Sequence, residues 1–204
     1  MYFHCFSVEW QERAADRACG VCARVAGKVY TIVFDFAQRK VILLPMSGLE
    51  SIRCAGAWSA EEVSRHLESS VIPLRLGAMA PSGYPLVFSL WYFWDGRSLW
   101  CASQRRARVV QHCLKYARCG FEVAGDQPPY CGVRGAADVT VVPEEGERIL
   151  RHLIARYLQS EESALARWLL ERVETEVALR ITPVRIYSWN YEARMKDVTA
   201  SPTD

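Results

Sequence analysis

The 204-residue sequence has no long apolar run and little net charge. A helix needs roughly 18 or more continuous apolar residues to cross a membrane, whereas the longest apolar run, PLVFSLWYFW at 85–94, has the length of a strand. The N-terminal stretch MYFHCFSVEWQER lacks the basic start and the apolar segment of a signal peptide. A net charge of +2 is too small to indicate nucleic-acid binding. We therefore expect a cytoplasmic protein with neither a membrane nor a nucleic acid as its partner.

Common motifs for metal binding and nucleophilic catalysis are also absent from the sequence. There is no glycine-rich phosphate loop, no nucleophile elbow and no HExxH motif. The four histidines are scattered, and none has a metal-ligating residue three or four positions further on: His4, His66, His112 and His152. Eight cysteines form no disulfide framework, and the one close pair, Cys19 and Cys22, is an isolated CxxC that is weak support for zinc or redox chemistry. The sequence therefore predicts no metal site.

The chain divides by composition into three parts. Residues 1–57 form an N-terminal extension that contains one hairpin pattern, KVYTIVFDF and VILLP joined by AQRK. A second methionine, Met46, follows the hairpin, so the sequence leaves open whether this extension is an accessory element or a stretch upstream of the start. Residues 58–195 form the main domain, and residues 196–204 form a polar tail.

The main domain reads as a mixture of helices and antiparallel strands. A capping box formed by Ser59 and Glu62 opens a helix that reaches about residue 69. Strands follow at 73–79, 84–94 and 98–103, with an Asp95-Gly96 hairpin between the last two. A helix then precedes strands at 119–125 and 130–142, two further helices begin at Pro143 and after a Ser160 cap, and strands at 176–183 and 184–191 end the domain. The order of the elements lacks the β-α-β alternation of a parallel sheet. We therefore expect an α+β fold, an antiparallel barrel with peripheral helices.

The junction between the strand at 98–103 and the next helix is strongly basic. From Trp100 to Gly120 the chain carries Arg105, Arg106, Arg108, Lys115 and Arg118 and no acidic residue. A solvated helix face is the simpler interpretation. However, if Ser103 is the N-cap, Arg105 and Arg106 fall in the first turn, where cations oppose the helix dipole. A bound anion would reverse this unfavourable effect, and arginine pairs well with phosphate oxygens. The pattern therefore favours a phosphate site.

A resemblance accompanies this pattern. The run RLGAMAPSGYPLVFSLWYFWDGRSLWCASQRRARVVQHC, with VRGAADV further on, resembles the pyridoxamine 5′-phosphate oxidase-like, flavin-binding split-barrel family over about residues 58–191. The resemblance implies a six-stranded split β-barrel and a homodimer with FMN at the subunit interface. Some members of the family use the deazaflavin F420 instead, and a few bind haem.

The resemblance also implies which residues bind the cofactor. The isoalloxazine ring would lie along the backbone of Val87, Phe88, Ser89 and Leu90. The ribityl-phosphate would meet Ala102 and Ser103, and its phosphate would be surrounded by Arg106 and Arg108. The site would be completed by Arg75 and Trp189. Trp189 would reach the flavin from the partner subunit, although a tryptophan of the core or of an interface is an equal alternative.

Two departures from the oxidase itself narrow the expected function. The oxidase holds its phosphorylated substrate with an Arg-x-His pair, and the corresponding segment here, VRIYSWNYEAR, lacks the histidine. The oxidase also has an arginine and a lysine on its first flavin strand, where this chain has PLVFSLWY. We therefore expect an FMN-dependent oxidoreductase that acts on another small substrate, with no catalytic side chain evident from the sequence. The alternatives are an F420-dependent reductase, a non-catalytic F420 or haem binder of the same fold, and, least favoured, a single-strand nucleic-acid module.

Overall fold

The computed structural model describes residues 21–25, 28–35, 40–45 and 52–196, and their contacts divide the chain into two units, Met1–Ser47 and Gly48–Asp204. The first unit contains a sheet of order β1-β2-β3, formed by Val21–Val25, Lys28–Asp35 and Lys40–Pro45. β2 and β3 pair antiparallel with Asp35 opposite Lys40, which confirms the predicted hairpin. Cys19 lies outside the described residues, so the CxxC interpretation stays untested.

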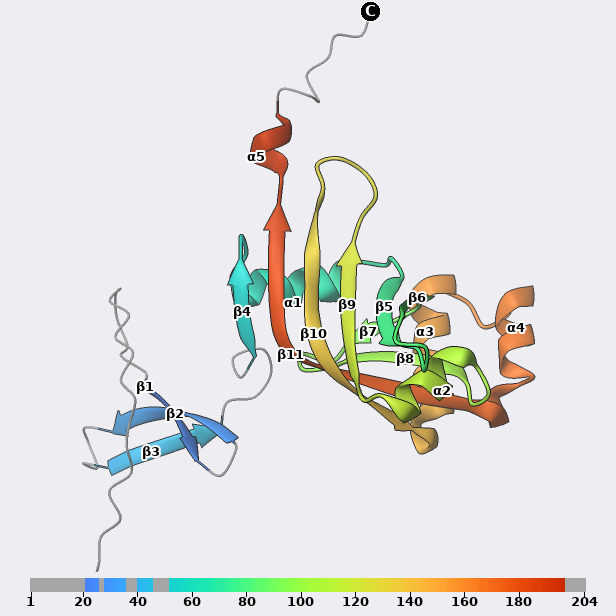
Figure 1. Cartoon of the computed structure of the whole chain (residues 1–204), viewed down its shortest axis with the longest axis horizontal. Helices are drawn as coiled ribbons and strands as arrows, with labels where there is room; N and C mark the ends of the chain where they lie inside the picture. Colours follow the sequence, from blue (N-terminus) through green and yellow to red (C-terminus); the bar gives the residue numbers. More distant parts are fainter. Residues whose placement is uncertain (1–20, 26–27, 36–39, 46–51, 197–204) are drawn as a thin grey trace, which may run out of the picture. The chain divides into compact units, whose positions relative to one another are not determined.

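The second unit is built on one curled sheet of eight strands (Figure 1). They are β4 (Arg53–Gly56), β5 (Leu74–Met79), β6 (Pro85–Leu90), β7 (Phe93–Trp94), β8 (Leu99–Gln104), β9 (Arg118–Ala124), β10 (Cys131–Val142) and β11 (Glu176–Asn190). The order is β6-β5-β9-β10-β11-β8-β7, and β4 joins β11 as the one parallel pair among them. The α+β antiparallel barrel is confirmed, with eight strands in place of the expected six.

The sheet curls because its two end strands follow one another along the chain. β6 ends at Leu90 and β7 begins at Phe93, so only Trp91 and Tyr92 separate the two ends of the strand order. Tyr92 is completely buried, and its hydroxyl donates to the carbonyls of Leu67 and Ser70 at 3.0 and 3.2 Å. These bonds hold the link between the two edges against the end of helix α1 (Ala60–Ser69).

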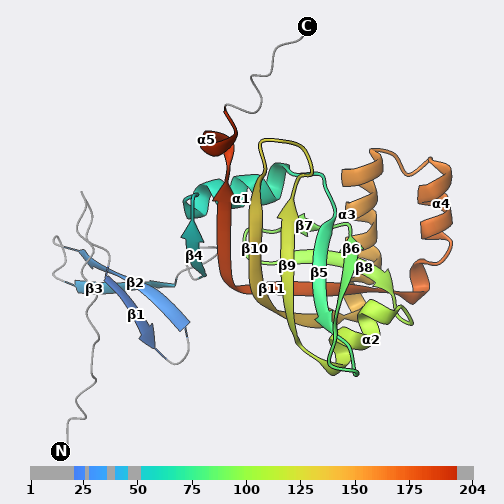
Figure 2. The same ribbon diagram turned by 45° about the horizontal axis from the view of Figure 1, so that its top comes forward.

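β11 is one strand with a bulge where the sequence predicts a boundary between two strands. Its first part pairs with β8 over Glu176–Ile181, and its second part pairs with β4 over Arg185–Ser188. Between them the register with β10 shifts at Ala136/Ala137, which leaves Val184 unmatched. Because a bulge bends a strand, the two parts run in different directions (Figures 1 and 2).

The helices pack around this sheet, and α1 begins where the sequence predicts. The capping box of α1 is confirmed, since Ser59 Oγ accepts from the Glu62 amide at 3.2 Å and Glu62 Oε2 accepts from the Ser59 amide at 2.8 Å. The remaining helical elements are α2 (Arg108–Lys115), the 3₁₀ turn η2 (Pro143–Glu145), α3 (Gly146–Leu158), α4 (Ala164–Leu170), the 3₁₀ turn η3 (Val173–Thr175) and α5 (Glu192–Met195).

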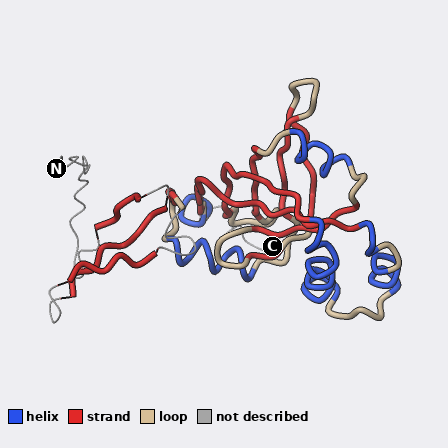
Figure 3. Tube along the Cα trace, turned by 90° about the horizontal axis from the view of Figure 1, so that it is seen from below, coloured by secondary structure: helices blue, strands red, loops and turns tan. Residues whose placement is uncertain are grey.

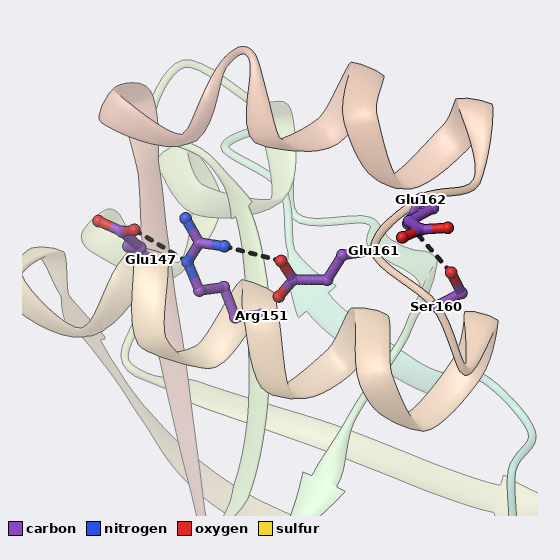
Figure 4. Close-up of polar contacts among 5 residues, drawn as sticks. All are labelled: Glu147, Arg151, Ser160, Glu161 and Glu162. Atoms are coloured by element: carbon purple, nitrogen blue, oxygen red, sulfur yellow. Dashed lines mark hydrogen bonds and ion pairs between the residues drawn. The ribbon is translucent and has the colours of Figure 1, made fainter.

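The predicted Ser160 cap of α4 is wrong. Ser163 is the N-cap, and its Oγ accepts from the Ala166 amide at 3.1 Å. Ser160 instead accepts from the Glu162 amide in the turn before the helix, and Arg151 of α3 bridges Glu147 and Glu161 beside that turn (Figure 4). These contacts fix the turn to α3, so α4 begins three residues later than predicted.

Two apolar layers result from this packing. The sheet and α1 enclose the main core, whose completely buried members include Val63, Leu67, Leu76, Leu99 and Ile181. α3 covers the opposite side of β8 and of the first part of β11, and the helices on that side of the sheet are visible in Figure 3. There Ile149 and Leu153 pack with Phe93 and Ala178.

Candidate functional site

The strand expected to carry the cofactor ring, β6, has a free edge. It is an end strand of the sheet order and pairs only with β5 among the described residues. Unpaired backbone amides and carbonyls along such an edge can bind a partner or a ligand. The structure therefore provides the backbone groups that the resemblance assigns to 87–90.

The side chains of β6 alternate between two faces. Val87, which is 69 % exposed, and Ser89 point away from the core. Phe88 and Leu90 are half-buried and pack against the main core. Phe88 also lies 6.1 Å, between ring centroids, from His112 of α2, so the helix that follows the basic junction packs beside this strand.

The basic junction begins later than the sequence indicates, and the predicted Ser103 N-cap is wrong. β8 continues through Gln104, which pairs with Glu176, and the Ala107 amide donates to the Gln104 carbonyl at 2.8 Å to close a turn. Ala107 is the N-cap of α2 and provides no side-chain acceptor. Arg105 and Arg106 thus lie in the turn before the helix, and Arg108 is the first helical residue.

Tertiary bonds explain why the strand is extended. The Gln104 side chain donates to Glu176 and to the Arg172 carbonyl, and accepts from the Thr175 hydroxyl. The Arg105 amide donates to the Thr175 carbonyl at 2.8 Å. These residues are far from Gln104 in the sequence, so local pattern could not place the end of β8.

The junction still concentrates positive charge without a protein counter-charge. Arg105, Arg106 and Arg108 are exposed, and none of their guanidinium groups makes a hydrogen bond or an ion pair with a described residue. The first turn of α2 contains no acidic residue. Amide groups at such a helix start have no side-chain acceptor. The junction therefore remains suited to an anion, although the helix begins at a later residue than predicted.

The end of β8 and the edge of β6 border the same opening of the barrel. β7 pairs with β8 only at Leu99 and Trp100, so beyond Trp100 that edge of β8 has no strand partner among the described residues. β6 runs directly into β7, and α2 packs against β5, β8 and β10. The free edges of β6 and β8 and the start of α2 therefore frame one region.

The two small residues of β8 differ in their surroundings. Ala102 packs against the apolar clusters beneath α3 and α4, so its side chain faces protein. Ser103, its neighbour in an alternating strand, is half-buried and pairs through its backbone with Val177. Because side chains alternate along a strand, the Ser103 side chain lies on the face of β8 opposite α3 and α4.

Arg75 and Trp189 lie on the outer face of the sheet, together with Val87 and Ser89. Arg75 is opposite Ser89, donates to the Ala124 carbonyl at 3.1 Å and lies 3.9 Å from Glu122. Trp189 is half-buried, and the Arg134 guanidinium carbon lies 5.3 Å from the centre of its ring. No hydrogen bond or ring contact joins this outer-face group to the basic junction within the described part of the chain.

A groove on this outer face is the feature that sequence reasoning missed. Its volume is about 700 Å³, and it is lined by Ala55, Gly120, Phe121, Glu122, Arg134, Gly135, Ala136, Arg185, Ile186 and Tyr187. The only sequence signal was the alternation of polar and apolar residues along β10 and β11, which predicts an exposed face but no hollow in it.

Three buried cysteines contribute packing and no reactive thiolate. Burial raises the pKa of the Cys113 thiol to about 11 and that of Cys119 to about 12, and it raises the pKa of Cys101 still further. These thiols stay protonated at neutral pH, as for ordinary core cysteines. Within the described residues no group of three or more metal-ligating side chains comes together. No described helix has both the length and the apolar character needed to span a bilayer.

Comparison with known proteins identifies the architecture. No family model matches the chain, and no curated protein matches it. Among solved structures, a conserved hypothetical protein from Mycobacterium tuberculosis superimposes with a TM-score of 0.57 at 20% identity, over 72% of this chain and 92% of that one. The chain has the split-barrel fold.

A second split barrel gives the same result. A candidate pyridoxamine 5′-phosphate oxidase from Listeria innocua superimposes with a TM-score of 0.50 at 16% identity, over 63% of this chain and 96% of that one. At such identities the likeness establishes the split barrel and leaves the ligand to be argued from the residues of the site.

Proposed function

We propose that this split-barrel protein is an FMN-binding oxidoreductase that acts on a small substrate. The observation that carries the proposal is the basic junction: three arginines whose guanidinium groups have no partner among the described residues, at the start of an uncapped helix that packs beside β6. A phosphate at the end of a flat, hydrogen-bonding ring system matches this pair of features, because arginine binds phosphate through paired hydrogen bonds and a strand edge binds ring heteroatoms.

In the proposed site each part of the chain has a separate task. Arg106 and Arg108 hold the phosphate, and Ser103 is the small β8 residue whose side chain is on the correct side to approach it. The backbone of Val87, Phe88, Ser89 and Leu90 orients the ring. Ala102, which packs beneath α3 and α4, contributes shape only. When bound, the flavin supplies the hydride chemistry.

The proposal includes a homodimer with the cofactor at the interface. The outer face of the sheet exposes large apolar side chains, among them Val87 at 69 % and Val184 at 57 %. Arg75 and Trp189 lie on the same face, apart from the basic junction of their own chain. A partner subunit would bring the Trp189 of one chain to the flavin of the other.

Replacing both phosphate-site arginines tests the proposal. Because hydrogen bonds to charged groups contribute roughly 1.5–3 kcal/mol each, the Arg106→Ala/Arg108→Ala variant should bind FMN at least about 100-fold more weakly than the wild type. Flavin fluorescence during titration of the apoprotein measures the affinity. Arg97→Ala, an exposed arginine in the β7–β8 turn at the other end of β8, is the control and should leave affinity unchanged. Equal FMN affinity in the double variant and the wild type would contradict the phosphate assignment.

A further inference from the structure

The groove on the outer face has a flat floor made of small residues. Gly77, Gly120 and Ala136 lie opposite one another in the register of β5, β9 and β10, and Arg185 of β11 ends this row. Glycine and alanine are poor strand residues, so their place in an exposed row is not explained by strand stability. Of this row, Gly120, Ala136 and Arg185 line the groove. With neighbouring strands roughly 4.8 Å apart, its two small residues leave a floor about the width of one aromatic ring.

Taller side chains border this floor on one side. A second row on the same face lies two residues away along each strand. It contains Glu122, Arg134 and Tyr187, which are again opposite one another. Tyr187 therefore lies beside the floor and contributes an aromatic ring to the lining of the groove. We name the floor and this border the sheet trough: Gly120, Ala136, Glu122, Arg134, Arg185 and Tyr187.

The two arginines of the sheet trough, Arg134 and Arg185, form no ion pair with a described residue. Arg185 lies directly opposite Arg53 of β4, and like charges in opposed positions destabilise a sheet. Neither arginine makes an ion pair with a described residue. Glu122 is opposite Arg134 in the register but forms its ion pair with Arg75, at 3.9 Å. An anion in the sheet trough would relieve the repulsion between Arg185 and Arg53.

Arg134 is held in place by aromatic rings. Its guanidinium carbon lies 5.3 Å from the ring centres of both Tyr187 and Trp189. Stacking on aromatic faces restricts a guanidinium and leaves its N–H groups directed to its rim. These ring contacts restrict the motion of the side chain, and such a restriction lowers the entropy cost of binding.

We propose that the sheet trough binds a flat aromatic ligand with a carboxylate or phosphate group. The ring lies over Gly120 and Ala136 beside Tyr187, and the anionic group pairs with Arg134 and Arg185. Anion binding follows from the charges and rings of this face alone. We identify this ligand as the substrate of the proposed enzyme, and that identification alone rests on the proposed function. The reason is that the proposed dimer brings the neighbouring Trp189 to the flavin of the partner subunit.

Calorimetric titration of the purified protein after incubation with FMN tests the inference. The probes are benzoate, the non-planar cyclohexanecarboxylate and inorganic phosphate. Benzoate should bind most tightly, and Arg134→Gln or Arg185→Gln should each weaken it about tenfold through loss of a charge-assisted hydrogen bond. Tyr187→Leu should reduce the preference for benzoate over cyclohexanecarboxylate. Arg167→Gln, an exposed arginine of α4, is the matched control and should have no effect.

Each alternative outcome can be distinguished. Unchanged benzoate affinity in the Arg134→Gln/Arg185→Gln variant overturns the inference, and so does a change in its sedimentation, because a partner subunit would then cover the arginines. Phosphate binding as tight as benzoate binding overturns the requirement for a flat ring. A wild-type protein that binds benzoate but takes up no FMN upholds the trough and contradicts the proposed function.

Discussion

Glu176, the first residue of β11, is a buried carboxyl group in a polar cluster. It is 6 % exposed, and its Oε1 accepts from Gln104 whereas its Oε2 has no hydrogen-bond partner among the described residues. Burial raises its pKa above the ordinary value of 4.5, although Gln104 and Arg172 oppose the shift. The folded chain thus binds this proton more tightly than the unfolded chain, so the contribution of Glu176 to stability falls as pH rises through the window above 4.5.

Glu176→Gln should remove this loss of stability. The free energy of unfolding of the variant, relative to the wild type, should increase as the pH rises from 4.5 to neutrality, because the amide cannot ionise. Urea unfolding at several pH values measures the difference. Glu174→Gln, at an exposed position of η3, is the control for the loss of one negative charge. A constant difference for Glu176→Gln would mean that its carboxyl titrates alike in both states.

The residues of the basic junction show what a sequence reveals at this scale. The absence of acidic neighbours around Arg105, Arg106 and Arg108 is visible in the sequence, and their guanidinium groups are indeed unpaired within the described part of the chain. The cap at Ser103 was wrong because Gln104 bonds to Thr175 and Glu176, about which the local pattern carries no information.

At the scale of elements, α1 was the most predictable helix because its signals are local. Its capping box forms as expected, and its buried residues Val63 and Leu67 are four apart. Ser59→Ala should lower the free energy of unfolding by about 1 kcal/mol through loss of the N-cap bond. Ser59→Asp should keep most of it, since aspartate is also a good cap. Thermal unfolding of both variants decides the point, and an equal loss in both would show that the cap bond contributes little.

The strands were less predictable where pairing is remote. β4 was not expected, since its four residues, RCAG, give no strand pattern and are held by parallel pairing to β11. The break expected at Pro183 is instead a bulge within one strand, because β10 pairs with residues on both sides of it. The same long-range registers place Gly120, Ala136 and Arg185 side by side, which explains why the sheet trough could not be read from the sequence.

At the scale of the whole molecule, the split barrel follows from consistent local signals. Alternating strands, the Asp95-Gly96 turn and the helix starts together indicated an antiparallel barrel with peripheral helices, and the structure confirms it. The proposed cofactor site depends on the opening of that barrel, where the free edges of β6 and β8 meet the start of α2. In the proposed dimer, Trp189 of one subunit completes this opening for the other.

The central claim is that the opening binds FMN, and an absorbance spectrum of the purified protein with mass spectrometry of the released cofactor tests it most directly. We predict the two near-ultraviolet and visible bands of a flavin, present on purification or after incubation with FMN, and the mass of FMN in the released fraction. A protein that stays colourless after incubation with FMN, or that releases F420 or haem instead, would contradict the account.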